Sequence, residues 1–200
     1  MKKIVIVGCG GHAVSCVEVL EKLKSFRILG IICKNSAHKL RSYRVIGNDK
    51  DLKKIQSKCK FAINCIGQIK SPLLRMKIYK KLKKNNFKLP KIISKTAYVS
   101  KKTIIGDGTI IMNMGFVNAN VKIGKNTIIN TRATIEHDAT IGSHCHISTG
   151  AIVNGGSFIG DGTFVGSGSI INENIIIGKN CTIGSNCKVN KNLKPNTLIK

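Results

Sequence analysis

Hydrophobic side chains recur at every sixth position along the C-terminal part of the chain. Each of the 16 such positions from 99 to 189 holds valine or isoleucine, and the residue four places further on is never charged. Glycine or asparagine usually comes directly after the aliphatic residue, as in "IGDGT" and "IGKNT". This strict period predicts a parallel β-helix, in which the aliphatic side chain fills a prism and glycine or asparagine forms each corner. With three faces per turn, these units give about five coils.

Residues 1–90 follow the pattern of an α/β domain instead. Apolar runs at 3–8, 26–33 and 61–67 are predicted strands, and the first run ends in a glycine-rich turn. Helices are predicted at 12–24 and 71–86 from apolar residues at helical spacing, which are Val14, Val17, Leu20 and Leu23 in the first helix and Leu74, Ile78 and Leu82 in the second. The alternation of strands and helices predicts a small Rossmann-like parallel sheet, followed by the β-helix at 91–200.

The chain carries 34 basic and nine acidic residues, a formal net charge of +25. A charge of this size predicts affinity for an anionic partner, unless it reflects only a general preference for lysine. Nucleic acid is a poor candidate, because aromatic residues make up only 4% of the chain and no nucleic-acid recognition motif occurs. Phosphorylated small molecules and an anionic membrane surface remain as partner classes.

Basic residues concentrate in 39–91, with 17 lysines and arginines against Asp49 and Asp51. The helix predicted at 71–86 places lysines opposite its apolar side, a pattern that fits weak association with an anionic membrane surface. A solvated helix face explains the same pattern, and the sequence favours that simpler interpretation.

Eight cysteines occur, at positions 9, 16, 33, 59, 65, 145, 181 and 187. None forms a CxxC pair, so we expect no zinc or other metal site and no thioredoxin-like motif. Several occupy positions where the pattern requires a small buried residue, as free cysteines commonly do. No apolar stretch approaches the ~20 residues of a membrane span. These features indicate a reduced, cytoplasmic protein.

His137 lies two positions after the inward-pointing Ile135, so its side chain is expected at a corner or on the outer face of the β-helix. Glu136 and Asp138 flank it, although the chain has few acids. A carboxylate beside an imidazole fixes its tautomer and raises its basicity, as a general base requires. The spacing alone favours a solvated turn histidine.

Three stretches together resemble one enzyme family: "VGCGGHA" at 7–13, "CIG" at 65–67 and "IINTRATIEHDATIG" at 128–142. They are similar to the sialic acid O-acetyltransferases and bacillosamine-type sugar N-acetyltransferases, hexapeptide-repeat enzymes of bacterial surface-glycan biosynthesis. The resemblance covers essentially the whole chain and implies that the β-helix is left-handed. It also implies acetyl-CoA as co-substrate, a nucleotide-sugar or sugar as acceptor, and a homotrimer that completes the active sites.

The resemblance makes His137 the catalytic base that deprotonates the attacking amine or hydroxyl. Asp138 supports this base, and Glu136 is a second acid that tunes it. The oxyanion formed during transfer also needs a hydrogen-bond donor, which we expect to be a backbone N–H at a corner.

Acetyl-CoA lies along the β-helix in the resembling family. The matching positions imply that His146 contacts it near the thioester. They imply further contacts from Gly166, Ser167, Gly184 and Ser185, although ordinary corner residues would give the same sequence. His144 has no counterpart and is expected at the surface.

The turn "GCGGHA" at 8–13 also fits the dinucleotide fingerprint G-x-G-x-x-G/A, which requires an acid after the second strand. Cys33 and Lys34 stand there instead, so NAD is not expected. In the resembling family this turn holds the nucleotide of a nucleotide-linked sugar. We expect Asn130, which begins the "NTRATIEH" block, to help position the acceptor. The implied nucleotide contacts are Gly10, Gly11, His12 and Gly67. Family members commonly carry acids at the position of Cys33 and Lys34, so this departure leaves the nucleotide open.

The sequence therefore predicts an acetyl-CoA-dependent acetyltransferase, with a nucleotide-sugar-binding domain at 1–90 and an acetyl-CoA-binding β-helix at 91–200. We expect direct transfer, since no cysteine or serine lies in a recognisable activated setting. The first acceptor expected is the amino group of a UDP-4-amino-sugar, and the alternative is a hydroxyl of a sialic-acid-like sugar. A non-catalytic binding protein on a decayed acyltransferase scaffold is a second alternative, against which the intact "IEHD" block argues.

Overall fold

The structure is a computed structural model that describes residues 1–34 and 39–200 in two compact units. The N-terminal unit comprises Met1–Gly67 and Leu73–Pro90, and the C-terminal unit comprises Gln68–Pro72 and Lys91–Lys200. No helix of the described residues is long and apolar enough to cross a membrane.

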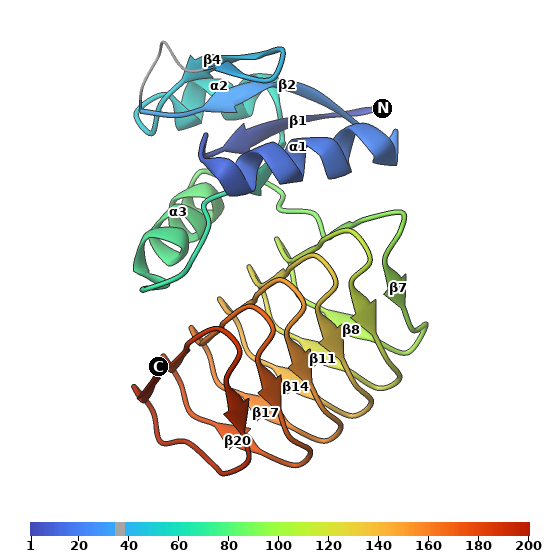
Figure 1. Cartoon of the computed structure of the whole chain (residues 1–200). Coiled ribbons are helices and arrows are strands. Elements are labelled where there is room, and N and C mark those ends of the chain that lie inside the picture. The colour runs from blue at the N-terminus through green and yellow to red at the C-terminus, as the bar shows by residue number, and fades with distance from the viewer. Residues whose placement is uncertain (35–38) are drawn as a thin grey trace. The chain divides into compact units, whose positions relative to one another are not determined.

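A five-stranded sheet in the order β3-β4-β2-β1-β5 forms the centre of the N-terminal unit (Figure 1). β1 pairs in parallel with β2 and β5, and β2 pairs in parallel with β4. The parallel sheet is confirmed, but β3 pairs antiparallel with β4, and neither strand was predicted. These strands bury few side chains and so leave no hydrophobic pattern. The elements are β1 Lys2–Val7, α1 Gly11–Leu23, β2 Phe26–Ile32, β3 Lys39–Leu40, β4 Tyr43–Gly47, α2 Leu52–Lys58, β5 Phe61–Asn64 and α3 Leu73–Lys84.

The two predicted helices form, and Val17 and Leu20 of α1 and Ile78 and Leu82 of α3 are buried as expected. The first apolar position of each pattern is exposed instead. Val14 of α1 is 45% exposed, and the buried side chains of that helix are Ala13, Cys16, Val17, Val19 and Leu20. Leu74 of α3 is 56% exposed, while Arg75 is fully buried together with Ile78, Tyr79 and Leu82. A charged residue therefore occupies the apolar stripe of α3.

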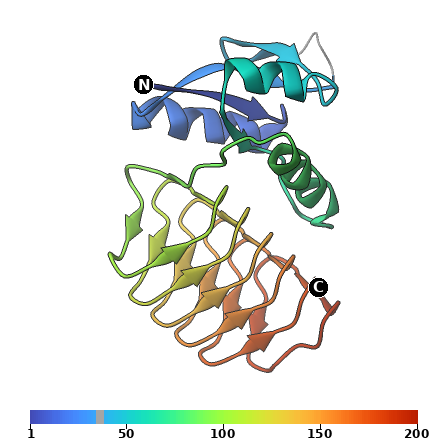
Figure 2. The same ribbon diagram turned by 180° about the vertical axis from the view of Figure 1, so that it is seen from behind.

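The C-terminal unit is the predicted parallel β-helix, and its coils stack as a regular prism (Figures 1 and 2). Each strand is two residues long, and strands pair in parallel with those one coil away. Three faces of seven, six and five strands result. The seven-stranded face contains β6 Ile92–Ile93, β9 Ile110–Ile111, β12 Ile128–Ile129, β15 His146–Ile147, β18 Phe164–Val165, β21 Thr182–Ile183 and β23 Leu198–Ile199.

The other two faces follow in chain order. The six-stranded face contains β7 Tyr98–Val99, β10 Phe116–Val117, β13 Thr134–Ile135, β16 Ile152–Val153, β19 Ile170–Ile171 and β22 Lys188–Val189. The five-stranded face contains β8 Ile104–Ile105, β11 Lys122–Ile123, β14 Thr140–Ile141, β17 Phe158–Ile159 and β20 Ile176–Ile177.

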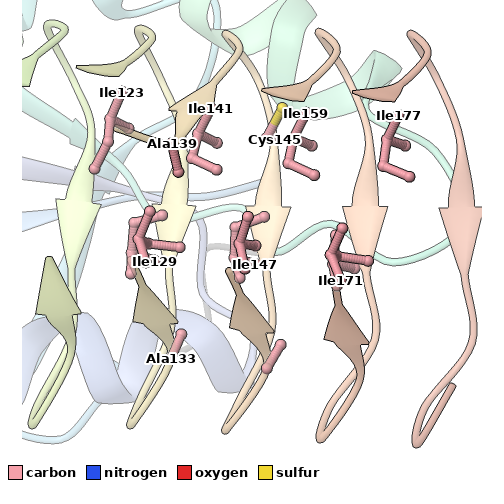
Figure 3. Close-up of a cluster of buried hydrophobic side chains, with 14 of the residues drawn as sticks. Ile123, Ile129, Ala133, Ala139, Ile141, Cys145, Ile147, Ile159, Ile171 and Ile177 are labelled. Atoms are coloured by element: carbon pink, nitrogen blue, oxygen red, sulfur yellow. The ribbon is translucent and has the colours of Figure 1, made fainter. Parts of the chain in front are cut away.

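The second residue of each strand points into the prism, as the six-residue period predicts. Apart from the half-buried Val99, all positions of the period are at most 8% exposed. Figure 3 shows these isoleucines from successive coils meeting in one core, together with the small residues Ala133, Ala139 and Cys145. The hydrophobic core thus runs along the prism, and the polar residues of the repeat are left to its three edges.

Residues 18 positions apart occupy the same place in successive coils, which defines the edges. We name the edge between the seven- and six-stranded faces the Asn130 edge, and the edge between the six- and five-stranded faces the His137 edge. The third edge is the glycine edge, with Gly106, Gly124, Gly142, Gly160 and Gly178. A Cβ atom on Gly124 would overlap the Ser143 backbone, so close stacking requires glycine there.

Candidate active site

His137 and Asp138 form a pair at the corner that follows β13. Nδ1 of His137 lies 2.9 Å from Oδ2 of Asp138, and the two side chains are 63% and 57% exposed. A carboxylate oxygen only accepts, so Nδ1 carries the proton and Nε2 holds the free lone pair of the neutral ring. Among the described residues no hydrogen-bonding group pairs with Nε2. This is the protonation geometry of a general base.

Asp138 is held by a second side chain, from the preceding coil. Nδ2 of Asn120 donates a 3.1 Å hydrogen bond to Oδ1 of Asp138. The hydrogen bonds from His137 and Asn120 lower the pKa of the Asp138 carboxyl, because both favour its charged form. Asp138 adopts a left-handed backbone with φ of 61°, which turns its side chain back toward His137. Asn120 was not found in the sequence analysis.

Glu136 lies at the same corner but interacts elsewhere. Its Oε2 accepts a 2.6 Å hydrogen bond from Nδ2 of Asn118, one coil earlier. Within the described part of the chain, no hydrogen bond or ion pair joins Glu136 to the His137 ring. The carboxylate directly available to the imidazole is therefore that of Asp138.

His146 lies on the seven-stranded face, not at the His137 corner. Its Nδ1 donates to the carbonyl oxygen of Gln68 at 2.5 Å, and its Nε2 accepts from Nδ2 of Asn130 at 3.1 Å. Its ring packs edge-on against Phe164, with 5.2 Å between centroids, and the residue is 6% exposed. These contacts fix the tautomer and orientation of His146 and tie it to Asn130.

The residues nominated for acetyl-CoA gather on the Asn130 edge. Asn130, Ser148, Gly166 and Gly184 occupy equivalent corner positions in four successive coils. A side chain on Gly166 would overlap the backbone of Gly184, so the coils are in close contact there. Ser167 pairs with Ser148 through their hydroxyls at 3.0 Å, and Ser185 continues the same row. The structure thus groups Gly166, Ser167, Gly184 and Ser185 with Asn130, and places His137 at the other border of the six-stranded face.

The expectation that His144 lies at the surface is wrong. The residue is only 7% exposed, and its Nδ1 lies 2.8 Å from Nδ2 of the buried Asn126, one coil earlier. Close stacking of the coils encloses its ring.

In the N-terminal unit the nominated nucleotide contacts lie where β1 and β5 end. Gly10 and Gly11 begin α1, and a Cβ atom on either would meet no atom within 4 Å. A Cβ on Gly67 would lie 3.5 Å from Cβ of His12, so the two turns adjoin. The start of α1 therefore combines open space at Gly10 and Gly11 with the positive end of a helix dipole, which favours an anionic group.

Gly8, not Gly10 or Gly11, is the glycine that the backbone requires in this turn. Its φ is +110°, and a Cβ atom there would lie 2.9 Å from Cδ1 of Ile66. Its conformation brings the end of β1 close to the turn after β5.

One pair of cysteines departs from the expectation of a reduced chain. Cys9 and Cys33 form a disulfide that links the turn after β1 to the residue after β2. The remaining six are free. The position where an acid would bind ribose hydroxyls is thus occupied by a disulfide sulfur.

Cys16 lies beneath the same turn, with its Sγ 3.4 Å from Nε2 of His12. Burial raises the pKa of the Cys16 thiol, but the hydrogen bond from Cys65 and the charges of His12 and Arg75 outweigh it, so the net shift is downward.

Arg75 is the residue of this unit that the sequence analysis missed. It is fully buried, and its Nη1 donates 2.7 Å hydrogen bonds to the carbonyl oxygens of Asn64 and Ile66. Burial lowers its pKa to about 10, which leaves it charged at neutral pH. Arg75 therefore fixes the turn that contains Gly67, and its place among apolar stripe residues was the available signal.

No group of three or more His, Cys, Asp or Glu side chains in the described ranges is arranged to hold a metal ion.

Two family models match the chain. The PglD N-terminal domain matches residues 3–82, and the bacterial transferase hexapeptide (six repeats) matches residues 120–155 and 156–191. No curated protein matches the chain.

Solved structures resemble almost the whole chain. A mutant of perosamine N-acetyltransferase from Caulobacter crescentus, in complex with CoA and GDP-perosamine, is 27% identical with a TM-score of 0.94, covering 99% of this chain and 93% of that one. The acetyltransferase domain of PglB from Neisseria gonorrhoeae, in complex with acetyl coenzyme A, is 26% identical with a TM-score of 0.87, covering 94% and 92%. WeeI from Acinetobacter baumannii, at 22% identity, a TM-score of 0.88 and coverage of 99% and 96%, shares the fold.

The family expectation is thereby confirmed, and the β-helix is of the left-handed hexapeptide type. The enzyme class is confirmed as well. The chain carries a PglD-type N-terminal domain followed by bacterial transferase hexapeptide repeats, and it is similar to solved sugar N-acetyltransferases over nearly its whole length.

Proposed function

We propose that the protein is an acetyl-CoA-dependent acetyltransferase that acts on the amino group of a nucleotide-linked amino-sugar. The observation that carries this proposal is the His137–Asp138 pair with its free Nε2, set at a corner of the β-helix. The similarity to a perosamine N-acetyltransferase with bound CoA and GDP-perosamine supports the reaction class and the kind of acceptor.

His137 acts as the base in this proposal. Its Nε2 accepts the proton that the neutral amine loses as the amine nitrogen attacks the acetyl carbonyl carbon. When the carbon–sulfur bond breaks, the same nitrogen returns the proton to the departing thiolate, and an amide and a free thiol result. Asp138 stabilises the imidazolium between these two steps through the hydrogen bond at Nδ1.

The N–H of Gly155 is our candidate for the oxyanion donor. Gly155 is buried one coil beyond His137 and lies against the face of its ring. Within the described chain its N–H donates no hydrogen bond, whereas the neighbouring Gly156 N–H donates to the carbonyl oxygen of His137. A buried, unpaired backbone donor beside the base is what a developing negative charge on the carbonyl oxygen requires.

The Asn130 edge is the proposed seat of acetyl-CoA. Gly166 and Gly184 carry no side chain over the edge, and the hydroxyls of Ser148 and Ser167 supply polar contacts. An extended chain with amide groups fits such a surface. Contacts from Ser185 and from the edge of the His146 ring remain predictions.

We further propose a homotrimer in which the His137 edge of one copy meets the Asn130 edge of the next. The two edges are the opposite borders of the six-stranded face. Within one chain the width of that face therefore separates His137 from the Asn130 edge. That face exposes a row of apolar side chains, with Tyr98 55%, Phe116 36% and Ile170 36% exposed. Tyr98 and Phe116 stack at 4.9 Å between centroids. Burying this row against a second copy would unite base and cofactor.

The N-terminal unit holds the nucleotide in this proposal. The first backbone N–H groups of α1, with His12 beside them, suit the diphosphate, and Gly67 lies next to them. A UDP-4-amino-sugar is the first acceptor to test. The second acceptor to test is a GDP-linked amino-sugar, because the similar perosamine N-acetyltransferase was solved with GDP-perosamine bound. The hydroxyl of a sialic-acid-like sugar is the alternative.

One surface fits a second anionic partner. The stripe of α3 formed by Leu73, Met76, Lys77, Lys80 and Lys84 is largely exposed, with apolar residues at its start and lysines beyond. Each such lysine contributes about 1 kcal/mol at an anionic membrane surface. Flotation with phosphatidylserine vesicles tests this association: it should be lost when Lys77, Lys80 and Lys84 become Glu, and equal flotation of both proteins would refute it.

The function is tested by incubating the protein with acetyl-CoA and three separate acceptors, a UDP-4-amino-sugar, a GDP-4-amino-sugar and free sialic acid. Mass spectrometry then follows the gain of one acetyl group. Gain on a nucleotide amino-sugar supports the proposal and identifies the nucleotide. Gain on sialic acid alone would replace it with O-acetylation, and no gain on any acceptor would favour the non-catalytic binding protein.

A further inference from the structure

The backbone conformation at position 155 does not require glycine. Ala119, His137, Gly155 and Glu173 occupy the same corner place in four successive coils of the His137 edge. In each corner the next residue takes the left-handed conformation, with φ between 57° and 67° at Asn120, Asp138, Gly156 and Asn174. Gly155 itself is not among the residues with positive φ. A side chain is therefore compatible with this backbone, as Ala119 and Glu173 demonstrate.

The space above Gly155 is filled by the ring of His137. A Cβ atom built on Gly155 would lie 2.7 Å from Cε1, 2.8 Å from Nε2 and 3.3 Å from Nδ1 of His137. The first two distances are shorter than a Cβ atom tolerates. The imidazole thus lies flat on the Cα of Gly155, and its three nearest ring atoms include both nitrogens.

We propose that Gly155 is a positioning residue whose missing side chain forms the seat of the catalytic imidazole. The seat limits the ring to the orientation in which Nδ1 meets Asp138 and Nε2 faces outward. This inference rests on the proposed role of His137 as base. It is separate from the proposed oxyanion role of the Gly155 N–H, because alanine keeps that N–H and changes only the volume.

The seat is also held in register with the base. Gly156 N donates a 3.0 Å hydrogen bond to the carbonyl oxygen of His137, which joins the two corners directly beside the ring. The exposed His137 ring can rotate away from an added methyl group, so Gly155→Ala should fold normally. What it should lose is the 2.9 Å contact between Nδ1 and Asp138.

The test is the variant Gly155→Ala, with Ala119→Gly as the matched control at the same corner place one coil before His137. We expect Gly155→Ala to lower kcat about 10- to 100-fold with little change in either KM, because a displaced base loses its geometry while substrates still bind. The control should retain wild-type kcat. Thermal unfolding should give similar midpoints for both variants and the wild type.

A spectroscopic readout separates positioning from a general disturbance. Long-range ¹H–¹⁵N NMR of His137 should show the Nδ1–H tautomer in the wild type and in Ala119→Gly, and a loss of that preference in Gly155→Ala. Either wild-type kcat or an unchanged tautomer in Gly155→Ala would overturn the inference.

His137→Ala is measured in parallel, so that two failures remain distinguishable. If His137→Ala keeps full activity, the proposed base is wrong. If His137→Ala is inactive while Gly155→Ala matches the wild type in kcat or tautomer, only the seat is wrong.

Discussion

Nδ2 of Asn120 donates a 3.1 Å hydrogen bond to Oδ1 of Asp138, which lies one coil further along the His137 edge. Because Oδ2 of the same carboxylate faces Nδ1 of His137, the acid is fixed between two coils and presented to the ring. The repeat thus supplies the rigid support that a general base needs, although the pair itself is exposed.

The first prediction concerns Asp138. Asp138→Asn keeps the shape of the side chain but removes the charge that stabilises an imidazolium. We expect kcat to fall about 100-fold with KM unchanged, at the lower end of what general-base catalysis contributes. Steady-state kinetics on the identified acceptor measures this. Glu136→Gln is the control, since Glu136 contacts Asn118 instead, and an equal loss in both variants would contradict the assignment.

The second prediction is the pH dependence of the pair. The hydrogen bonds from His137 and Asn120 lower the Asp138 pKa. Because the pKa of Asp138 is lower in the folded state, its carboxylate stabilises the fold at pH values above the unfolded-state pKa of ~3.9. This stabilisation is lost as the pH falls through the folded-state pKa. Asn120→Ala should therefore raise the pKa of Asp138 toward its ordinary value. Carboxyl ¹³C NMR titration measures the shift.

Asn196→Ala is the matched control for that titration. Asn196 shares the left-handed backbone, with φ of 62° against 60° for Asn120, so both variants carry the same backbone strain. An unchanged Asp138 titration in Asn120→Ala would show that the inter-coil hydrogen bond is absent in solution.

A third prediction concerns the buried guanidinium of Arg75. Arg75→Met removes the donor to the carbonyl oxygens of Asn64 and Ile66, at about 1–3 kcal/mol for each unsatisfied group. Removal of a buried charge offsets part of this loss. We expect the free energy of unfolding to fall by about 2 kcal/mol and the KM for the nucleotide-sugar to rise, because the Gly67 turn loses its support. Arg27→Met at an exposed site is the control for denaturant unfolding, and equal stability of the two variants would contradict this role.

The fourth prediction addresses the missing acid after β2. Cys33→Asp and Cys33→Asn both break the disulfide with Cys9, but only aspartate accepts hydrogen bonds as a carboxylate. We expect the KM for the nucleotide-sugar to be about tenfold lower in the Asp variant than in the Asn variant, equivalent to about 1.4 kcal/mol. Equal KM values would mean that this position does not face the nucleotide.

The fifth prediction tests the proposed trimer. Phe116→Glu places a charge in the apolar row of the six-stranded face. We expect this variant to be a monomer by light scattering and to lack acetyltransferase activity. Phe158→Glu alters a similarly exposed ring of the five-stranded face, 42% against 36%, and should leave the oligomer intact. A monomeric wild type would refute the shared site.

The sequence predicts the β-helix almost residue by residue, because every sixth side chain meets the same core environment. The contact between His137 and Asp138 could be predicted because the two residues are adjacent in the chain, and their catalytic roles, which the family resemblance implies, stay a prediction. Asn120 and Gly155 lie one coil away from Asp138 and His137, so the six-residue period alone does not reveal them. A comparison of positions 18 residues apart would have paired them. His144 is misjudged for the same reason, since Asn126 encloses it from the preceding coil.

In the N-terminal unit the errors have a different origin. Helical spacing cannot decide which of two adjacent residues faces the sheet, so Val14 and Leu74 were placed inside while Arg75 was overlooked. The disulfide between Cys9 and Cys33 joins residues brought together only by the pairing of β1 with β2, which spacing along the chain does not reveal.

The most direct measurement is acetyl transfer to the nucleotide amino-sugars by the wild type and by His137→Ala, followed by mass spectrometry under single-turnover conditions. We expect the amino nitrogen to gain one acetyl group, and the rate to be lowered about 10²- to 10⁴-fold in His137→Ala. Equal rates for the two proteins would contradict the central claim that His137 is the base.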